Sequence, residues 1–370
     1  IDSLARRGEV GTVRTVPAGM PPASDVANLS VMGYDPARYY TGRSPLEAVS
    51  MGLQLGPKDV AFRCNLVTVS DEPDYADKTM VDYCSEEIST EEARELVAEV
   101  ERRLGTDAIS FHPGISYRHC MIWKGGPLKC GLTPPHDISQ RVVRDYLPPG
   151  ETGRTILGMM EESHSFLRDH PVNRARRARG LRPANSIWLW GEGTKPAIAP
   201  FRDKYGLEGS VVSAVDLIKG LGICAGLRSV DVEGATGNID TNFRGKAEAA
   251  LAELRSGRDF AYVHLEAPDE CGHRREIENK VRAIELIDAE VVGALLAGLE
   301  GLGAYRMLVL PDHPTPLSIR THASDPVPFL IYEKGAERES GVASYDEAQA
   351  RTTGLHIEVG HTLMDRFLGK

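Results

Sequence analysis

The sequence predicts an α/β protein in which a doubly wound parallel sheet, covered by helices on both faces, carries an inserted smaller α+β domain. Short and mostly apolar runs, such as 260–265 and 306–310, are typical of strands buried on both faces. In the second half of the chain these runs alternate with helical patterns, as they do in βαβ units. Between about residues 56 and 150, strand and helix patterns are mixed instead, which indicates a separate α+β unit.

The main domain is predicted to begin with residues 1–55. Residues 1–8 resemble the end of a helix stopped by a glycine, and a strand-like alternation follows at 11–16. A Pro- and Gly-rich loop then leads to helical apolar spacing at 26–33. Ser24 lies just before that helix. It is either an ordinary N-cap or a nucleophile at a helix N-terminus, where free N–H groups would receive a phosphoryl group.

The inserted α+β domain is assigned to residues 56–150. Its strand-like runs are 60–69, 80–83, 109–111 and 117–123, and a capping box at 89–92 opens its long helix. Within this domain Arg118 lies beside His119. Such a pair is either surface decoration or part of an anion site, since a guanidinium and an imidazole both bind carboxylates and phosphates.

Residues 151–179 are assigned to a helical, basic linker that leads back to the main domain at 180–370. The arginines of this stretch favour a solvated helix face over a polyanion site. In the returning main domain the predicted strands are 186–191, 211–217, 230–232, 260–265, 306–310 and 327–332, and the predicted helices are 246–254 and 281–299.

Two of the predicted strands end in an aspartate that is followed by a histidine. Asp312 and His313 directly follow one strand, and His322 comes nine residues after His313. Asp269 and His273 follow the other strand and are four residues apart, so on a helical turn they would share one face. Either pair alone could be a cap with a surface histidine. Two such strand ends in one chain favour metal ligands at the edge of a sheet.

These candidates predict a type of chemistry. Mixed carboxylate and imidazole ligands suit zinc or manganese, and the candidates are numerous enough for two ions. Paired metals stabilise both the attacking and the leaving oxygens of a phosphoryl transfer, and Ser24 would be the nucleophile. The sequence therefore predicts metal-dependent phosphoryl transfer.

Composition excludes several other classes of protein. The net charge of −10 argues against nucleic acid as the main partner, and an anionic small substrate would need a local basic pocket. No apolar run approaches the length of about 18 residues that a membrane span needs, and the start shows no basic, apolar secretion signal. The six cysteines are scattered without a C-x-x-C pair, which indicates reduced thiols in a cytoplasmic protein.

Several motifs together resemble a known family. They are Pro21-Pro22-Ala23-Ser24-Asp25, Gly33-Tyr34-Asp35-Pro36, Tyr39-Tyr40-Thr41-Gly42-Arg43, Glu266-Ala267-Pro268-Asp269-Glu270, Pro311-Asp312-His313-Pro314-Thr315-Pro316 and Thr321-His322. With these motifs the chain resembles the archaeal-type cofactor-independent phosphoglycerate mutases of the alkaline phosphatase superfamily. The resemblance implies an alkaline-phosphatase-like domain with an inserted smaller domain, and two divalent ions, manganese foremost with zinc or magnesium as alternatives. It also implies a glycolytic reaction, the interconversion of 3-phosphoglycerate and 2-phosphoglycerate through a phosphoserine.

The resemblance also assigns roles to residues. Ser24 is the implied nucleophile and a ligand of one ion together with Asp312 and His313, while Asp269, His273 and His322 are the implied ligands of the other ion. The candidates for binding the carboxylate and phosphate of the substrate are Arg118 and His119 from the inserted domain, and Arg182 and Lys219 from the main domain.

One feature of the family is missing. Its members begin with a strand that ends in Asp-Gly, whose aspartate completes the first metal site, and the start of this chain supplies no such residue. We expect that aspartate to precede residue 1. Two alternatives to the mutase remain open from the sequence: a related phosphotransferase such as a homoserine kinase, and a catalytically inactive homologue. The oligomeric state is not predicted.

Overall fold

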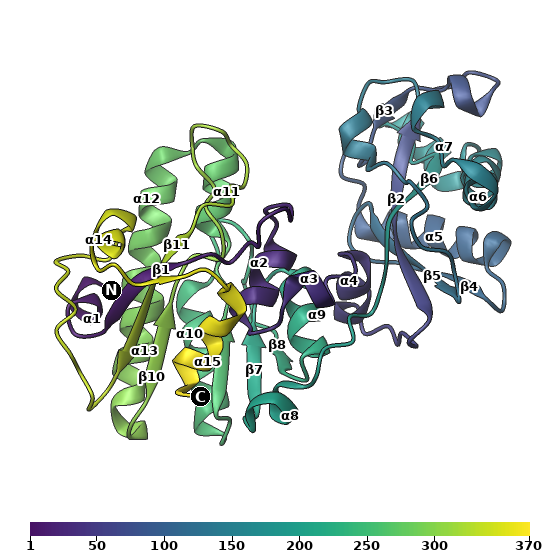
Figure 1. The fold of residues 1–370 in the computed structure, drawn as a ribbon. Helices are drawn as coiled ribbons and strands as arrows, with labels where there is room; N and C mark the ends of the chain where they lie inside the picture. Colours follow the sequence, from purple (N-terminus) through teal and green to yellow (C-terminus); the bar gives the residue numbers. More distant parts are fainter. The chain divides into compact units, whose positions relative to one another are not determined.

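A computed structural model describes residues 1 to 370 (Figure 1). The chain divides into two compact units: unit 1 comprises Ile1–Tyr40 and Ala197–Lys370, and unit 2 comprises Thr41–Pro196. These limits differ from the predicted ones, because unit 2 begins before residue 56 and continues through the predicted linker to residue 196. No helix combines the length and the apolar character that crossing a membrane requires.

The first sheet of unit 1 is parallel. Its strands are β7 (Gly209–Val212), β8 (Arg228–Val230) and β9 (Phe260–Val263), in the order β8-β7-β9. The helix α9 (Asp216–Cys224) connects β7 to β8, and α10 (Phe243–Arg255) connects β8 to β9. α9 packs against both strands that it connects, and α10 packs against β9 and β7. This part has the βαβ alternation that the sequence predicts.

Local sequence explains where α10 begins and which face it buries. The side chain of Asn242 caps the helix by accepting a hydrogen bond from the Gly245 N–H at 2.8 Å. The buried residues Phe243, Ala247 and Ala250 recur at helical spacing, so they form one apolar stripe. Phe243 and Ala247 of that stripe belong to a buried cluster with Val263 at the end of β9 and with residues of the segment 267–294.

The second sheet of unit 1 is mixed rather than parallel. It contains β1 (Glu9–Val13), β10 (Arg306–Val309), β11 (Val327–Glu333) and β12 (His356–Ile357), in the order β10-β11-β1-β12. β11 runs antiparallel to both β10 and β1, so the prediction of a wholly parallel sheet is wrong here. A parallel return needs a crossover, usually a helix. Residues 310–326 contain no helix, so the chain turns back beside β10.

The remaining helices of unit 1 surround these sheets. They are α1 (Asp2–Ala5), α2 (Ser24–Val31), α3 (Pro36–Tyr39), α8 (Phe201–Tyr205), α11 (Ala267–Arg274), α12 (Ile277–Leu286), α13 (Gly293–Leu299), α14 (Glu347–Thr352) and α15 (Leu363–Leu368), with short 3-10 turns at Glu300–Leu302 and Gly360–Thr362. A π-helical turn, Ile287–Val292, joins α12 to α13. The helix expected at 281–299 therefore starts earlier and is irregular in its middle.

Unit 2 is built on a five-stranded antiparallel sheet. Its strands are β2 (Asp59–Val69), β3 (Met80–Asp82), β4 (Ile109–His112), β5 (Arg118–Lys124) and β6 (Ser186–Thr194). The long strand β2 lies centrally and pairs with β3, β5 and β6. The sequence predicts that β6 restarts the main sheet. That prediction is wrong, because an apolar run does not reveal which sheet it joins.

Four helices belong to unit 2. They are α4 (Ser44–Ser50), α5 (Thr90–Leu104), α6 (Gly150–Leu167) and α7 (Pro171–Ala178), with 3-10 turns at Tyr75–Asp77, Pro135–Ile138 and Arg144–Tyr146. The predicted capping box opens α5: the Ser89 side chain accepts a hydrogen bond from the Glu92 N–H at 3.2 Å.

The predicted basic linker is part of the unit 2 core. Ile156, Met160 and Leu167 of α6 are buried in the main apolar cluster of this unit. On α7, the Arg176 side chain is 2% exposed, forms an ion pair with Glu92 and donates to backbone carbonyls. The linker prediction is wrong because the apolar face of α6 and the buried Arg176 have partners far away in the sequence. The predicted solvated helix face is confirmed for Arg174, Arg177 and Arg179, which are exposed.

Candidate active site

Three parts of unit 1 bring the predicted catalytic and metal-binding side chains together. Ser24 is the first residue of α2, Asp269 and His273 lie on α11 just after β9, and Asp312, His313 and His322 lie in the loop after β10. Figure 1 shows α11 and α2 beside the loops at one end of unit 1. All six side chains are linked by contacts of 3.5 Å or less or by a close pair of rings.

Ser24 belongs to the first half of this cluster. Its Oγ lies 3.0 Å from Nε2 of His313, and the same Nε2 lies 3.5 Å from Oδ2 of Asp312. The N-cap of α2 is Ala23, with no side-chain cap, so the interpretation of Ser24 as an ordinary N-cap is wrong. The hydroxyl is directed at a histidine and not at the backbone of its own helix.

Asp269, His273 and His322 form the second half. Oδ2 of Asp269 lies 3.3 Å from Nε2 of His273, and Oδ1 lies 3.4 Å from Nε2 of His322. The two Nε2 atoms are 3.0 Å apart. One carboxylate and two imidazole nitrogens thus surround a common point.

Backbone carbonyls determine the tautomers of both histidines. Nδ1 of His273 lies 3.0 Å from the carbonyl oxygen of Arg320, and Nδ1 of His322 lies 3.0 Å from that of Pro22. A carbonyl only accepts, so each Nδ1 carries the proton and each Nε2 of a neutral ring carries a lone pair. Two lone pairs that face each other beside a carboxylate repel, unless a cation lies between them. This donor set fits a divalent metal ion.

The two halves adjoin through His313 and His322. Their ring centroids are 4.0 Å apart, and the ligand atoms of Asp269, His313 and His322 all lie within 4.8 Å of one another. Two carboxylates, three imidazoles and a serine hydroxyl therefore form one continuous group, which includes a candidate metal site at Asp269, His313 and His322.

Asp269 is held in its ionised form. Burial raises the pKa of this carboxyl, but hydrogen bonds from the protonated form of His322 and from Thr315 outweigh burial in the metal-free site and lower the pKa to about 2. The Thr315 hydroxyl donates directly to Oδ1, and its residue is 5% exposed. The hydrogen bond with Asp269 in turn raises the pKa of His322, although burial opposes it. At neutral pH Asp269 is thus a charged ligand.

Some supporting residues were not singled out from the sequence. Asn28 donates a hydrogen bond to Asp312 at 2.8 Å, and Thr315 supports Asp269. The sequence could have indicated Asn28 through its spacing, because it lies four residues after Ser24 and therefore on the same helix face. Thr315 stands between two prolines in the motif that follows Asp312, but nothing in that motif indicates a contact with Asp269.

The structure does not bring the predicted substrate-binding residues into one cluster within a unit. Arg118, His119 and Arg182 all belong to unit 2, whereas Lys219 lies on α9 of unit 1. The assignment of Arg182 to the main domain is therefore wrong. It forms an ion pair of 3.0 Å with Asp82.

Each of the other three residues has a different environment. Arg118 is exposed at the start of β5, and His119 beside it is 5% exposed, with Nδ1 accepting from the Gly114 N–H at 3.0 Å. Nζ of Lys219 lies 2.6 Å from Oδ1 of Asp231. Arg118 and Arg182 are thus both exposed, and Arg182 is engaged by Asp82.

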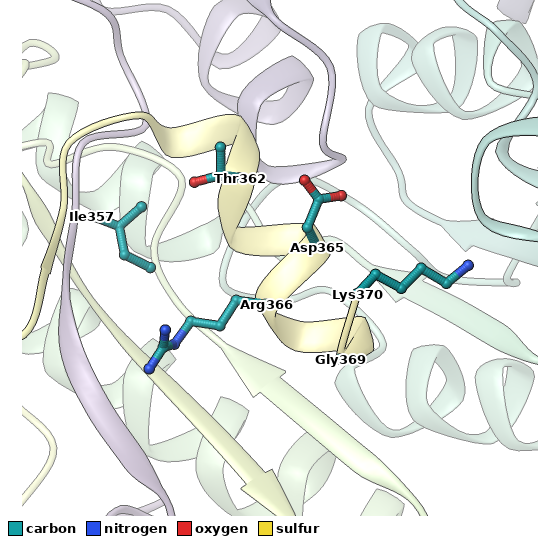
Figure 2. A pocket seen from close by; sticks show the side chains of 6 residues that line it. All are labelled: Ile357, Thr362, Asp365, Arg366, Gly369 and Lys370. Atoms are coloured by element: carbon teal, nitrogen blue, oxygen red, sulfur yellow. The ribbon is translucent and has the colours of Figure 1, made fainter.

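A surface hollow beside α15 lies apart from this cluster. It is lined by Ile357, Thr362, Asp365, Arg366, Gly369 and Lys370, none of which is a candidate ligand (Figure 2). Figure 2 shows the Arg366 and Lys370 side chains pointing to opposite sides of the helix. Arg366 is paired with Glu9. The hollow therefore does not bring together side chains that could bind metal ions or carry out phosphoryl transfer.

A serine hydroxyl beside clustered carboxylates and imidazoles is typical of a metal-dependent phosphoryl-transfer enzyme. Comparison with known proteins identifies the family. Residues 5–173 match the family described as 2,3-bisphosphoglycerate-independent phosphoglycerate mutase. A probable 2,3-bisphosphoglycerate-independent phosphoglycerate mutase of Geobacter sulfurreducens is 52% identical over 100% of this chain and 92% of its own length. The enzyme of Methanothrix thermoacetophila is 50% identical over 98% of this chain and 90% of its own length.

Solved structures agree with the sequence relatives. A protein of Pyrococcus horikoshii aligns with a TM-score of 0.80 at 28% identity, over 100% of this chain and 88% of that one. The cofactor-independent phosphoglycerate mutase of Thermoplasma acidophilum aligns with a TM-score of 0.61 at 26% identity, over 100% of this chain and 90% of that one. The chain belongs to the 2,3-bisphosphoglycerate-independent phosphoglycerate mutase family, and its activity is that of a phosphoglycerate mutase.

Proposed function

We propose that this chain interconverts 3-phosphoglycerate and 2-phosphoglycerate through a phosphoserine at Ser24, with two divalent ions, manganese foremost, as cofactors. The observation that carries the proposal is the contact of 3.0 Å between Ser24 Oγ and His313 Nε2 within the carboxylate–imidazole cluster. The proposal includes an alkaline-phosphatase-like, doubly wound arrangement for unit 1 and a cytoplasmic location for the protein.

In the proposed reaction Ser24 accepts the phosphoryl group and then returns it. As the bond between Oγ and phosphorus forms, the bond between phosphorus and O3 of the substrate breaks, and the serine proton ends on O3. The 2-hydroxyl of the glycerate then takes the phosphoryl group from Oγ, and its proton returns to the serine. Ser24 lies at the N-terminus of α2, so the helix dipole favours the anionic group there.

Metal binding is assigned to the six clustered side chains. Asp312 and His313 would hold one ion beside Ser24, and Asp269, His273 and His322 would hold the other. When bound, such ions supply positive charge that favours ionisation of the serine hydroxyl and stabilises the phosphoryl oxygens. The carbonyls that fix the imidazole tautomers keep the Nε2 lone pairs available for this task.

Each unit contains basic side chains that could bind the carboxylate and phosphate of the substrate. His119 is enclosed and Arg182 is already paired with Asp82, so both would have to change their environment to bind an anion. Arg118 is exposed in unit 2, and Lys219 lies in unit 1 on α9, which packs against α2. Lys219 is paired as well, but its partner Asp231 is 87% exposed whereas Asp82 is 10% exposed, so the pair of Lys219 is the weaker one. The proposal assigns carboxylate and phosphate binding first to Arg118 and Lys219.

The test is an enolase-coupled assay that follows 2-phosphoglycerate formed from 3-phosphoglycerate and Mn²⁺. We expect turnover that needs no 2,3-bisphosphoglycerate and that falls by about 10⁴-fold or more in Ser24→Ala. A metal-loaded, folded protein without mutase turnover would contradict the proposal, and ATP-dependent phosphorylation of homoserine would replace it with a kinase.

A further inference from the structure

Asn28 connects the three parts of unit 1 that build the site. It is fully buried on α2, one helical turn after Ser24. Its side chain contacts Asp312 in the loop after β10 and Tyr262 on β9. These partners are 284 and 234 residues away in the sequence. A single amide therefore joins the nucleophile's helix to both strand ends.

The partners of Asn28 also fix which way its amide points. Nδ2 donates to the carbonyl oxygen of Ser24 and to Oδ2 of Asp312, each at 2.8 Å. Both partners only accept, so the NH₂ group must lie on their side. Oδ1 accepts a hydrogen bond from the hydroxyl of Tyr262. A flipped amide would place oxygen against oxygen at both contacts, so the side chain has one stable orientation.

The same hydrogen bonds restrict the Asp312 carboxylate. Oδ2 accepts from the amide of Asn28, and Oδ1 accepts from the backbone N–H of His313 at 2.9 Å. With one donor on each oxygen, the carboxylate cannot rotate without losing a hydrogen bond. In this orientation Oδ2 also lies 3.5 Å from Nε2 of His313.

We propose that Asn28 is a positioning residue that fixes the Asp312 carboxylate against Ser24 for metal binding. The proposal rests on the metal site proposed above. The amide of Asn28 is suited to holding the Asp312 carboxylate because it provides two hydrogen-bond donors and no charge, whereas an aspartate at this position would repel Asp312. Asn28 acts through Asp312 and Ser24 and does not itself touch the substrate.

The test compares two buried asparagines with the same hydrogen-bonding pattern. Asn173 in unit 2 is also fully buried, and its Nδ2 donates to the carbonyls of Leu167 and Ala184 at 2.8 Å. Its Oδ1 accepts from the Ala184 N–H at 2.8 Å. Asn173→Leu thus removes three comparable hydrogen bonds away from the site and is the matched control for Asn28→Leu.

Binding of Mn²⁺ alone is measured on the metal-free full chain by calorimetry, and Asp312→Ala identifies the component of binding that depends on Asp312. We expect Asn28→Leu to weaken that component by about tenfold or more, and Asn173→Leu to leave it within about twofold of wild type. Equal Mn²⁺ binding by the two variants would overturn the inference. Wild-type protein that binds no Mn²⁺ would overturn the proposed function as well, so the two failures are distinct.

A milder variant decides the question if Asn28→Leu does not fold. Tyr262→Phe removes only the hydroxyl that holds Oδ1 of Asn28 and keeps the buried ring. We expect it to weaken the Asp312-dependent binding of Mn²⁺ by roughly threefold, because the amide loses one of its three anchors. Unchanged binding in Tyr262→Phe would then overturn the inference.

Discussion

Replacing Thr315 by valine removes one hydroxyl from the metal cluster, which donates to Asp269 and also lies 3.4 Å from Nδ1 of His313. Valine has nearly the shape of threonine, so the change removes the hydroxyl that donates to Oδ1 of Asp269 without opening a cavity. At 5% exposure, water cannot easily take the place of this donor. A hydrogen bond to a charged group contributes about 1.5–3 kcal/mol, which corresponds to roughly 10- to 150-fold in an equilibrium constant.

The Thr315 hydroxyl stabilises the Asp269 carboxylate in the metal-free protein as well as in the metal-bound protein. Only the difference between these two contributions therefore affects the Mn²⁺ affinity. We therefore expect a decrease in Mn²⁺ affinity that stays below the top of this range, at roughly 10- to 100-fold, as for other residues that orient a metal ligand. The pKa of Asp269 should rise from its present value of about 2, since one of the hydrogen bonds that lower it is gone.

The assay is a calorimetric Mn²⁺ titration of metal-free protein, together with the Mn²⁺ concentration that half-activates turnover. Thr315→Ser keeps the hydroxyl and should stay near wild type. Thr68→Val in unit 2 is the matched control, because Thr68 is equally buried and donates to the Pro183 carbonyl at 2.8 Å. The reasoning is refuted if Thr315→Val binds Mn²⁺ as tightly as Thr68→Val does.

Three further predictions concern stability, pH and metal removal. Arg176→Ala should lower the unfolding free energy of unit 2 by about 1–3 kcal/mol, because the buried Ser85 carbonyl loses its donor while Glu92 keeps Arg179, and exposed Arg177→Ala should change it by less than about 0.5 kcal/mol. Tryptophan fluorescence in urea measures both, since all three tryptophans lie in unit 2. Burial lowers the pKa of His119 to about 3 from the ordinary 6.5, so as pH falls below 6.5 only the unfolded chain gains this proton. This histidine thus removes about 2 kcal/mol of stability at pH 5, and His119→Phe should reduce the acid sensitivity of the urea midpoint accordingly; an unchanged pH dependence would contradict this. Treatment with a chelator should abolish mutase turnover in the enolase-coupled assay, and Mn²⁺ should restore it; full activity after verified metal removal would refute metal dependence.

Much of the candidate site can be predicted from the sequence, because the relevant residues follow strand-like runs. Asp269 with His273 and Asp312 with His313 each occur where an apolar run ends, and strand ends are where α/β proteins place their sites. Ser24 follows a Pro-rich loop at a helix start. These local patterns are sufficient to indicate which side chains converge.

Other features depend on partners that a local pattern does not reveal. An apolar strand such as β6 fits either sheet, and only its pairing with β2 places it in unit 2. The arginine-rich stretch looks solvated because the burial of Arg176 requires Glu92, 84 residues earlier. Asn28 is an ordinary helix residue until Asp312 and Tyr262 are brought against it. In each case the missing information is a long-range contact.

Trapping the phosphoryl group on the enzyme tests the central claim most directly. The metal-loaded protein is mixed with 3-phosphoglycerate, quenched in acid within a turnover, digested, and examined by peptide mass spectrometry. The account predicts phosphate on the peptide that contains Ser24, at the serine itself, and none in Ser24→Ala. Rapid turnover with Ser24 never phosphorylated, or a Ser24→Ala variant that retains turnover, would contradict it.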